Sequence, residues 1–157
     1  MKRLVMLLVG AALITIGCAH GRTSYYPKCA EECAEVTVVR KIAYMGGAST
    51  LGITLDGFPI AHVETGEYLK FQLSRGIHSI GLESIGTSFD SGVSIPFESG
   101  KKYFFLIDTS AALMKFFIQR VEENEINELL KTKRVDTNSM VPVGYRELDP
   151  NLIAKPR

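Results

Sequence analysis

Side chains that could perform acid–base or metal chemistry are few and widely spaced in this sequence. His62 and His78 stand outside any metal-ligand motif, and a lone histidine supplies only one ligand or one base. Asp90 and Glu98 could act as an acid–base pair only if the fold brought them together, and Asp108 ends an apolar run, where aspartate commonly caps a turn. Phosphate loops, nucleophile elbows, zinc-protease motifs and calcium loops are missing from the sequence. We therefore expect a protein that is not an enzyme, with no catalytic residue, metal or cofactor.

Two of the three cysteines, Cys29 and Cys33, are four residues apart in a stretch compatible with a short helix. On a helix they would share one face, with Cα atoms about 6 Å apart, a separation that a disulfide allows. A thioredoxin-type redox couple needs two intervening residues rather than three, and a zinc site needs about four ligands, whereas only His20 lies near. We expect a structural disulfide that closes a small loop. Unpaired thiols and a metal or redox site are the alternatives.

The N-terminus has the composition of an export signal. Lys2 and Arg3 give it a positive start, residues 4–16 are uncharged and mostly apolar, and the small residue Gly17 precedes Cys18. The apolar run is too short to span a bilayer, which takes about 20 residues. Residues 14–18 resemble the lipobox of bacterial lipoproteins, although Thr15 stands where that family usually has an aliphatic residue. A soluble secreted protein and an uncleaved anchor are the alternatives.

The lipobox resemblance implies that the signal, residues 1–17, is removed and that Cys18 carries palmitate-type acyl chains. Ala19 rather than aspartate follows the cysteine, which in Gram-negative lipoproteins implies the outer membrane. Removing 17 of the 157 residues leaves 140, enough for one domain. Because only Lys2 and Arg3 are charged in the removed part, 16 basic and 17 acidic residues remain. This balance argues against a nucleic-acid partner.

The mature chain has the pattern of an antiparallel sheet protein. Leu51, Ile53 and Leu55 alternate with small or polar residues before the Asp56 and Gly57 turn, a strong hairpin signal. Further glycine-containing turns follow at the spacing typical of a sandwich. We predict one antiparallel β-sandwich of about seven to eight strands, with boundaries uncertain by about 2–4 residues. The predicted strands lie near residues 36–43, 50–56, 59–63, 67–74, 77–84, 93–98, 102–108 and 113–121.

Residues 122–133 form the one clear helical pattern, with acidic residues at its start and basic residues at its end. Residues 103–107 are apolar on both faces of their strand, so we expect the helix to cover Phe104, Leu106 and Phe117. An exposed aromatic strand face that binds a partner is the competing interpretation. The expected organisation is thus a signal at 1–17, a lipidated cysteine, tether and short helix at 18–35, a sandwich with terminal helix at 36–135, and a polar tail or strap at 136–157.

Four short motifs occur in order along the chain: Asp-Gly at 56–57, Gly-x-Tyr at 66–68, Arg-Gly-x-His at 75–78 and Gly-Lys-x-Tyr-Phe at 100–104. This order resembles small bacterial lipoproteins known only as a domain of unknown function, whose core is similar to the PEGA-type β-sandwich. That family has proline where this chain has Arg75, and a second tyrosine where it has Phe104. The resemblance covers roughly residues 36–135. It implies a sandwich fold and a structural role for His78, and it carries over no catalytic residue.

Two functions follow as expectations. The first is a lipoprotein held to membrane lipid through Cys18, facing the periplasm and serving as an envelope interaction or scaffold protein that binds a protein partner through a sheet edge or the aromatic strands. The second is a cell-wall glycan-binding module in which Phe58 and Phe89 stack on sugar rings. Because phenylalanine is more often buried than exposed, we expect the Phe58 side chain to pack beneath its turn and not to serve as a platform for a sugar ring.

Replacing Cys18 with alanine removes the expected acylation site. We expect the Cys18→Ala protein to leave the membrane fraction, because each buried acyl CH₂ contributes about 0.8 kcal/mol to membrane binding and no other anchor is expected. Cell fractionation with immunodetection measures the change. A Cys18→Ala protein that still sediments with membranes would contradict the lipid anchor.

Overall fold

The computed structural model describes residues 29, 32–42, 50–84, 87–88, 92–110, 115–132, 134–135 and 142–148. The expected signal, Cys18 and the tether lie outside this range, as do Phe89 and Asp90. No helix in the described part of the chain is long and apolar enough to cross a membrane.

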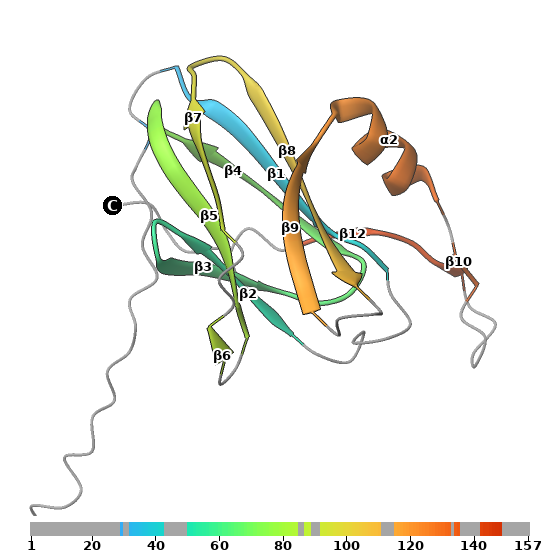
Figure 1. Ribbon diagram of the computed structural model, residues 1–157. Coiled ribbons are helices and arrows are strands. Elements are labelled where there is room, and N and C mark those ends of the chain that lie inside the picture. The colour runs from blue at the N-terminus through green and yellow to red at the C-terminus, as the bar shows by residue number, and fades with distance from the viewer. Residues whose placement is uncertain are drawn as a thin grey trace, which may run out of the picture.

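The described residues fold into two packed sheets and one helix, which confirms the predicted mainly-β sandwich (Figure 1). The first sheet has the strand order β12-β4-β1-β8-β9, and in the second, β3-β2-β5, both β6 and β7 pair with β5. The first sheet contains β1 (Ala34–Arg40), β4 (Glu67–Leu73), β8 (Lys102–Ser110), β9 (Lys115–Val121) and β12 (Arg146–Glu147). The second contains β2 (Leu51–Leu55), β3 (Phe58–Val63), β5 (Gly76–Ser84), β6 (Thr87–Ser88) and β7 (Val93–Phe97). A separate short pair joins β10 (Arg134–Val135) to β11 (Pro142–Val143).

Two strand pairs depart from the antiparallel arrangement that was predicted. β1 runs parallel to β8, and β12 runs parallel to β4, while the other pairs are antiparallel. Alternation of apolar and polar residues reports which face of a strand is buried and carries no information on its direction. Because β1 and β8 are far apart in the sequence, their direction depends on how the chain crosses between the sheets.

The core lies between the two sheets and follows the alternation seen in the sequence. Leu51, Ile53 and Leu55 of β2 are fully buried, and they face the inner side chains of β1 and β8. The ring of Phe97 lies 4.5 Å from that of Tyr103 and 6.2 Å from that of Phe105, in tilted geometries that favour aromatic pairs. These rings connect β7 of one sheet to β8 of the other.

Tight turns with positive φ connect several strands. Asp56 and Gly57 have φ values of 51° and 80°, which makes the predicted two-residue hairpin turn between β2 and β3. Gly66, in the turn directly before β4, has φ at 77°, and a Cβ there would lie 2.9 Å from Cγ1 of Ile42. The close approach lets the Gly66 amide donate to the Arg40 carbonyl at 3.1 Å and ties β4 to the end of β1.

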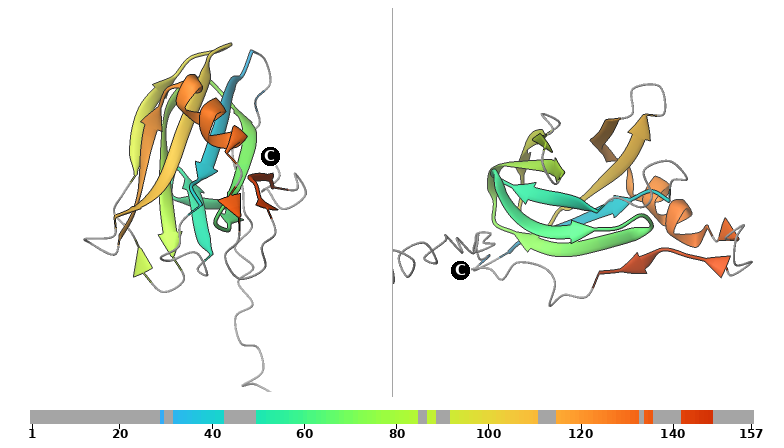
Figure 2. Two further views of the ribbon diagram at one scale, coloured as in Figure 1. Left: turned by 90° about the vertical axis from the view of Figure 1, so that its right-hand side faces the viewer. Right: turned by 90° about the horizontal axis from the view of Figure 1, so that it is seen from below.

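The helix α2 (Glu123–Lys131) packs on the outer face of the first sheet (Figures 1 and 2). Ile126 is its only fully buried residue and contacts Val39 and Leu106, with Phe104 packed beside them. The predicted cover over Phe104 and Leu106 is confirmed. The predicted contact with Phe117 is wrong, because Phe117 pairs with Asp108 farther along β9 and lies outside this cluster. The helix is too short to reach it.

Cys29 and Cys33 are joined by a disulfide in the structure, with Cα atoms 5.8 Å apart. The Cys33 carbonyl accepts a hydrogen bond from the Gly100 amide at 3.0 Å, and the Glu35 amide donates to the Lys101 carbonyl at 2.9 Å. The disulfide loop is therefore fastened to the turn between β7 and β8. This end of the sandwich, where β1 begins, is called the disulfide end below.

Replacing Ile126 with alanine should undock the helix. We expect the free energy of unfolding to fall by about 2 kcal/mol, at the lower end of the range for buried aliphatic truncations because the site lies near the surface. The exposed neighbour Glu125→Ala should change it by less than about 0.5 kcal/mol. Urea denaturation of both variants measures the difference. Equal losses of unfolding free energy in the two variants would contradict this expectation, because they would mean that helix propensity matters and the packing of Ile126 does not.

Candidate functional site

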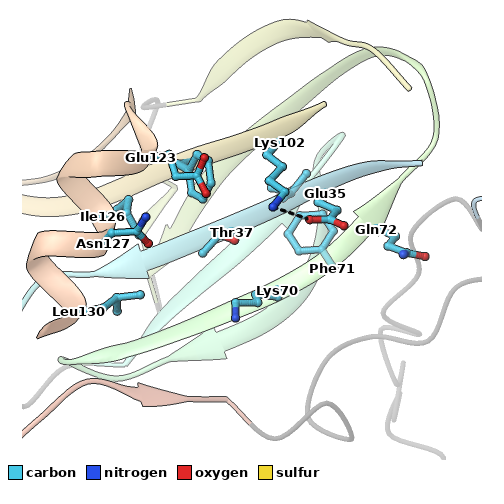
Figure 3. A pocket seen from close by; sticks show the side chains of 12 residues that line it. Glu35, Thr37, Lys70, Phe71, Gln72, Lys102, Glu123, Ile126, Asn127 and Leu130 are labelled. Atoms are coloured by element: carbon cyan, nitrogen blue, oxygen red, sulfur yellow. Dashed lines mark ion pairs between the residues drawn. The ribbon is translucent and has the colours of Figure 1, made fainter. Parts of the chain in front are cut away.

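One candidate site is a hollow of about 430 Å³ between α2 and the outer face of the first sheet (Figure 3). We call it the helix–sheet groove. β1, β4 and β8 supply its floor, and one face of the helix supplies its wall. Its lining includes Glu35, Thr37, Lys70, Gln72, Lys102, Phe104, Glu123, Ile126, Asn127 and Leu130.

The groove exists because the outer face of the first sheet changes from polar to apolar along its length. On β1 the outer positions run from Glu35 through Thr37 to Val39, and on β8 they run from Lys102 to Leu106. The helix covers the apolar half of this face, so the polar half toward the disulfide end stays open beside it. The result is a floor with an apolar side and a charged rim.

Both signs of charge occur on the rim. The Lys102 ammonium lies 3.9 Å from the Glu35 carboxylate, and both side chains are more than half exposed. The Lys70 ammonium lies 3.5 Å from the Glu147 carboxylate and 5.4 Å from the centre of the Tyr68 ring. Exposed pairs of this kind contribute little to stability. Their charges can therefore be redirected to a bound partner at small cost.

The C-terminal segment forms a strap along the edge of β4, where β12 pairs with Glu67 and Tyr68. Glu67 is buried, it accepts a hydrogen bond from the Glu64 amide at 2.8 Å, and it makes a close ion pair with Arg146. The hydrogen bond that Arg146 donates to the Glu67 carboxylate, together with the charge of that carboxylate, raises the pKa of Arg146. The amide of Leu148, a buried residue, donates to the Tyr68 carbonyl at 2.7 Å. The strap thus joins the sandwich next to the groove.

A buried guanidinium lies at the end of the sandwich opposite the disulfide. Arg40 is 2% exposed, donates to the Val63 carbonyl at 2.8 Å and stacks on the Phe116 ring at 5.2 Å. Burial lowers the pKa of Arg40, and the nearby carboxylates of Glu64 and Glu67 oppose that effect. This arrangement stabilises the positive charge within the fold and gives Arg40 a structural role.

Asp108 and His78 also have structural roles. Asp108 accepts from the Lys41 ammonium at 2.7 Å and from the Thr109 amide at 2.7 Å. His78 places Nδ1 2.7 Å from the Asp56 carboxylate, whose second oxygen accepts from the Ser79 amide at 2.8 Å. The pair fastens the β2–β3 turn to β5.

The pairing of Asp90 with Glu98 stays a prediction, because Asp90 lies outside the described range. Glu98 forms an ion pair with Lys101 at 2.7 Å. His62 is exposed on β3. Nε2 of His78 is buried without a hydrogen-bond partner among the described residues. Within that same part of the chain, no three histidine, cysteine or acidic side chains gather where they could hold a metal.

Phe58 is 55% exposed, which corrects the expectation of a side chain packed beneath its turn. It follows the two-residue turn at the start of β3, which is an edge strand of the second sheet in the described part of the chain. The groove residues Thr37, Lys70, Lys102 and Asn127 were not predicted as a site. Strand alternation places the first three on one outer face, but the position of α2 above them depends on tertiary packing.

No protein-family model matches the chain, and no curated protein matches it.

The hydrogen bond from the Tyr68 hydroxyl to Glu147, 3.0 Å long, gives a testable pH dependence. Burial, followed by this bond and the Glu147 charge, raises the pKa of Tyr68 above its ordinary value of about 10. The fold thus favours the neutral phenol, so the stabilisation is complete below about pH 10 and is lost as pH rises through the raised pKa. We expect Tyr68→Phe to lower the free energy of unfolding by about 0.5 kcal/mol at pH 7 and by progressively less above pH 10.

Urea denaturation of wild type and Tyr68→Phe between pH 7 and pH 11 measures this difference. Glu147→Gln is the matched control, because it keeps a hydrogen-bond acceptor and removes the negative charge. Without that charge the pKa of Tyr68 should be raised less, so the stabilisation that Tyr68 provides should be lost at a lower pH. A pH-independent effect of Tyr68→Phe would contradict the assignment.

Proposed function

We propose that this chain is a non-enzymatic lipoprotein of the cell envelope, anchored in the outer membrane through an acylated Cys18 and facing the periplasm. Its sandwich holds an envelope protein partner in the helix–sheet groove. The proposal agrees with the resemblance of the N-terminus to a lipobox and of the domain to small lipoproteins with a PEGA-like core.

The groove is the observation that carries the proposal. It combines an apolar wall, Ile126 and Leu130, with a rim that presents Lys70 and Lys102 near Glu35 and Glu123 (Figure 3). A polypeptide segment supplies both apolar side chains and charges of either sign, so it matches this mixture better than a uniformly charged or uniformly apolar ligand does. Charges on such a rim select the partner and its register more than they add affinity.

The composition of the groove supports binding rather than catalysis. Its acidic and basic side chains are exposed lysines and glutamates. Histidine and cysteine do not occur among its lining residues, as far as the described chain extends. Binding requires only complementary shape and charge, which these residues provide.

The partner can be found by photo-crosslinking in intact cells. A photoreactive amino acid at Asn127, which lines the groove, should give a discrete protein adduct, whereas one at the exposed Glu125 on the same helix should not. Because Lys102→Glu reverses one rim charge, we expect it to reduce the Asn127 adduct about fivefold, corresponding to about 1 kcal/mol. Immunoblotting of the adduct band measures both effects.

Equal adducts at positions 125 and 127, or an Asn127 adduct indifferent to Lys102→Glu, would contradict the groove as the binding site. Glycan binding remains the alternative because Phe58 is half exposed. Saturable co-sedimentation of the protein with purified cell-wall sacculi, lost in Phe58→Ala, would favour that function, with Phe89→Ala testing the second predicted aromatic.

A further inference from the structure

The edge of β4 is paired over only part of its length by the residues that the structure describes. β12 lies beside Glu67 and Tyr68, whereas no described strand lies beside residues 69–73 on that side. An unpaired edge presents backbone N–H and C=O groups that can bond to another strand. This open stretch also borders the helix–sheet groove, because Lys70 and Gln72 line it (Figure 3).

The hydrogen bonds of β12 show which backbone groups of β4 face this edge. The amide of Leu148 donates to the Tyr68 carbonyl at 2.7 Å, so the backbone groups of Tyr68 point toward β12. The N–H and C=O of one strand residue point to the same side, and successive residues alternate. Lys70 and Gln72 therefore direct both groups to the open edge, while residues 69, 71 and 73 direct theirs to β1.

The sequence explains why β12 does not continue along this edge. Its ladder advances two residues at a time, from the Arg146 amide to the Leu148 amide, so residue 150 would have to donate next, to the Lys70 carbonyl. Residue 150 is proline, which has no N–H. In this register the chain's own C-terminal segment cannot supply the next hydrogen bond, so the edge favours a strand from another polypeptide.

The edge strands β3, β7 and β9 are less suited to receive that strand. β3 contains Pro59 and a register shift against β2, and β7 contains Pro96. Prolines and bulges are features by which natural edge strands resist pairing. β9 contributes no residue to the lining of the groove, as far as the described chain extends. The open stretch of β4 has no proline, its register with β1 is continuous, and it borders the groove.

We propose that the partner held in the groove binds as an added strand, whose backbone pairs with Lys70 and Gln72 on the open edge of β4. This inference rests on the proposed function and names the form of the partner, an extended segment. Strand addition draws its affinity from main-chain hydrogen bonds and its selectivity from alternate side chains. Alternate side chains of the added strand lie on the outer face of the first sheet, beside the groove.

β12 indicates the side chain that such a strand carries on its outer face. Glu147 of β12 places its carboxylate 3.5 Å from the Lys70 ammonium and accepts a hydrogen bond from the Tyr68 hydroxyl at 3.0 Å. Natural edge strands use lysine to deter pairing, so a strand that neutralises Lys70 is favoured over others. The Lys70 side chain is about half exposed, and its ammonium can contact a second carboxylate. We therefore expect an acidic residue beside Lys70 in the added strand.

Gln72→Pro tests the backbone contact without changing the charge of the groove. It removes the N–H that faces the open edge, and it leaves the ladder between β4 and β1, to which residues 71 and 73 contribute. Gln72→Ala is the matched control, because it removes the same side chain and keeps the N–H. Each variant is combined with the photoreactive amino acid at Asn127, and urea denaturation establishes that both are folded.

We expect Gln72→Pro to reduce the Asn127 adduct about tenfold, because one backbone hydrogen bond is lost and the partner's carbonyl is left unpaired, while Gln72→Ala keeps the adduct. Equal adducts in the two variants would overturn the strand addition and leave the groove as the binding site. Absence of an Asn127 adduct in the otherwise unchanged chain would remove the groove as the binding site, and the strand addition with it.

A photoreactive amino acid at Gln72 identifies the occupant of the edge without the proline variant. An adduct with the same protein that Asn127 captures supports the proposal, and absence of that adduct at Gln72 overturns it. A crosslink within the chain to residues 149–157 in its place would show that the chain's own C-terminal segment occupies the edge. An adduct with a second copy of the chain would overturn the proposal in favour of self-association.

Discussion

The hydrophobic character of β8 on both of its faces is the constraint on which the rest of the structure depends. Its inner residues Tyr103, Phe105 and Ile107 fill the core between the sheets, while Phe104 and Leu106 point to the other side. A strand that is apolar on both faces must be covered twice. The second sheet covers one face and α2 covers the other. A helix of nine residues is only about 14 Å long, so part of the outer face remains open, and that part is the helix–sheet groove.

The two ends of the sandwich differ in the side chains that they bury and expose. At the end where β1 finishes, Arg40 is buried and would be costly without partners. The Val63 carbonyl, the Phe116 ring and the carboxylates of Glu64 and Glu67 surround it, and Glu67 in turn holds Arg146 of the strap. The C-terminal segment therefore closes an end that is rich in charge. At the disulfide end, by contrast, Ile77 of β5 is exposed to solvent.

The sequence by itself determined the secondary structure and the face that each strand buries. Period-two alternation at Leu51, Ile53 and Leu55, the Asp56 and Gly57 turn, and the helical stripe around Ile126 are local signals, because they arise from backbone geometry and the burial of neighbouring side chains. The structure matches each of them. The apolar residues on both faces of the strand at 103–107 also predicted that another element packs over Phe104 and Leu106.

Only the tertiary structure decided what depends on residues far apart in the chain. The parallel pairing of β1 with β8, the position of α2 short of Phe117, and the burial of Arg40 follow from how the sheets stack, which alternation cannot encode. The pairing of His78 with Asp56 follows from strand register. For the same reason the groove could not be read from the sequence. It requires the relative placement of a helix and three strands, and long-range packing supplies that placement.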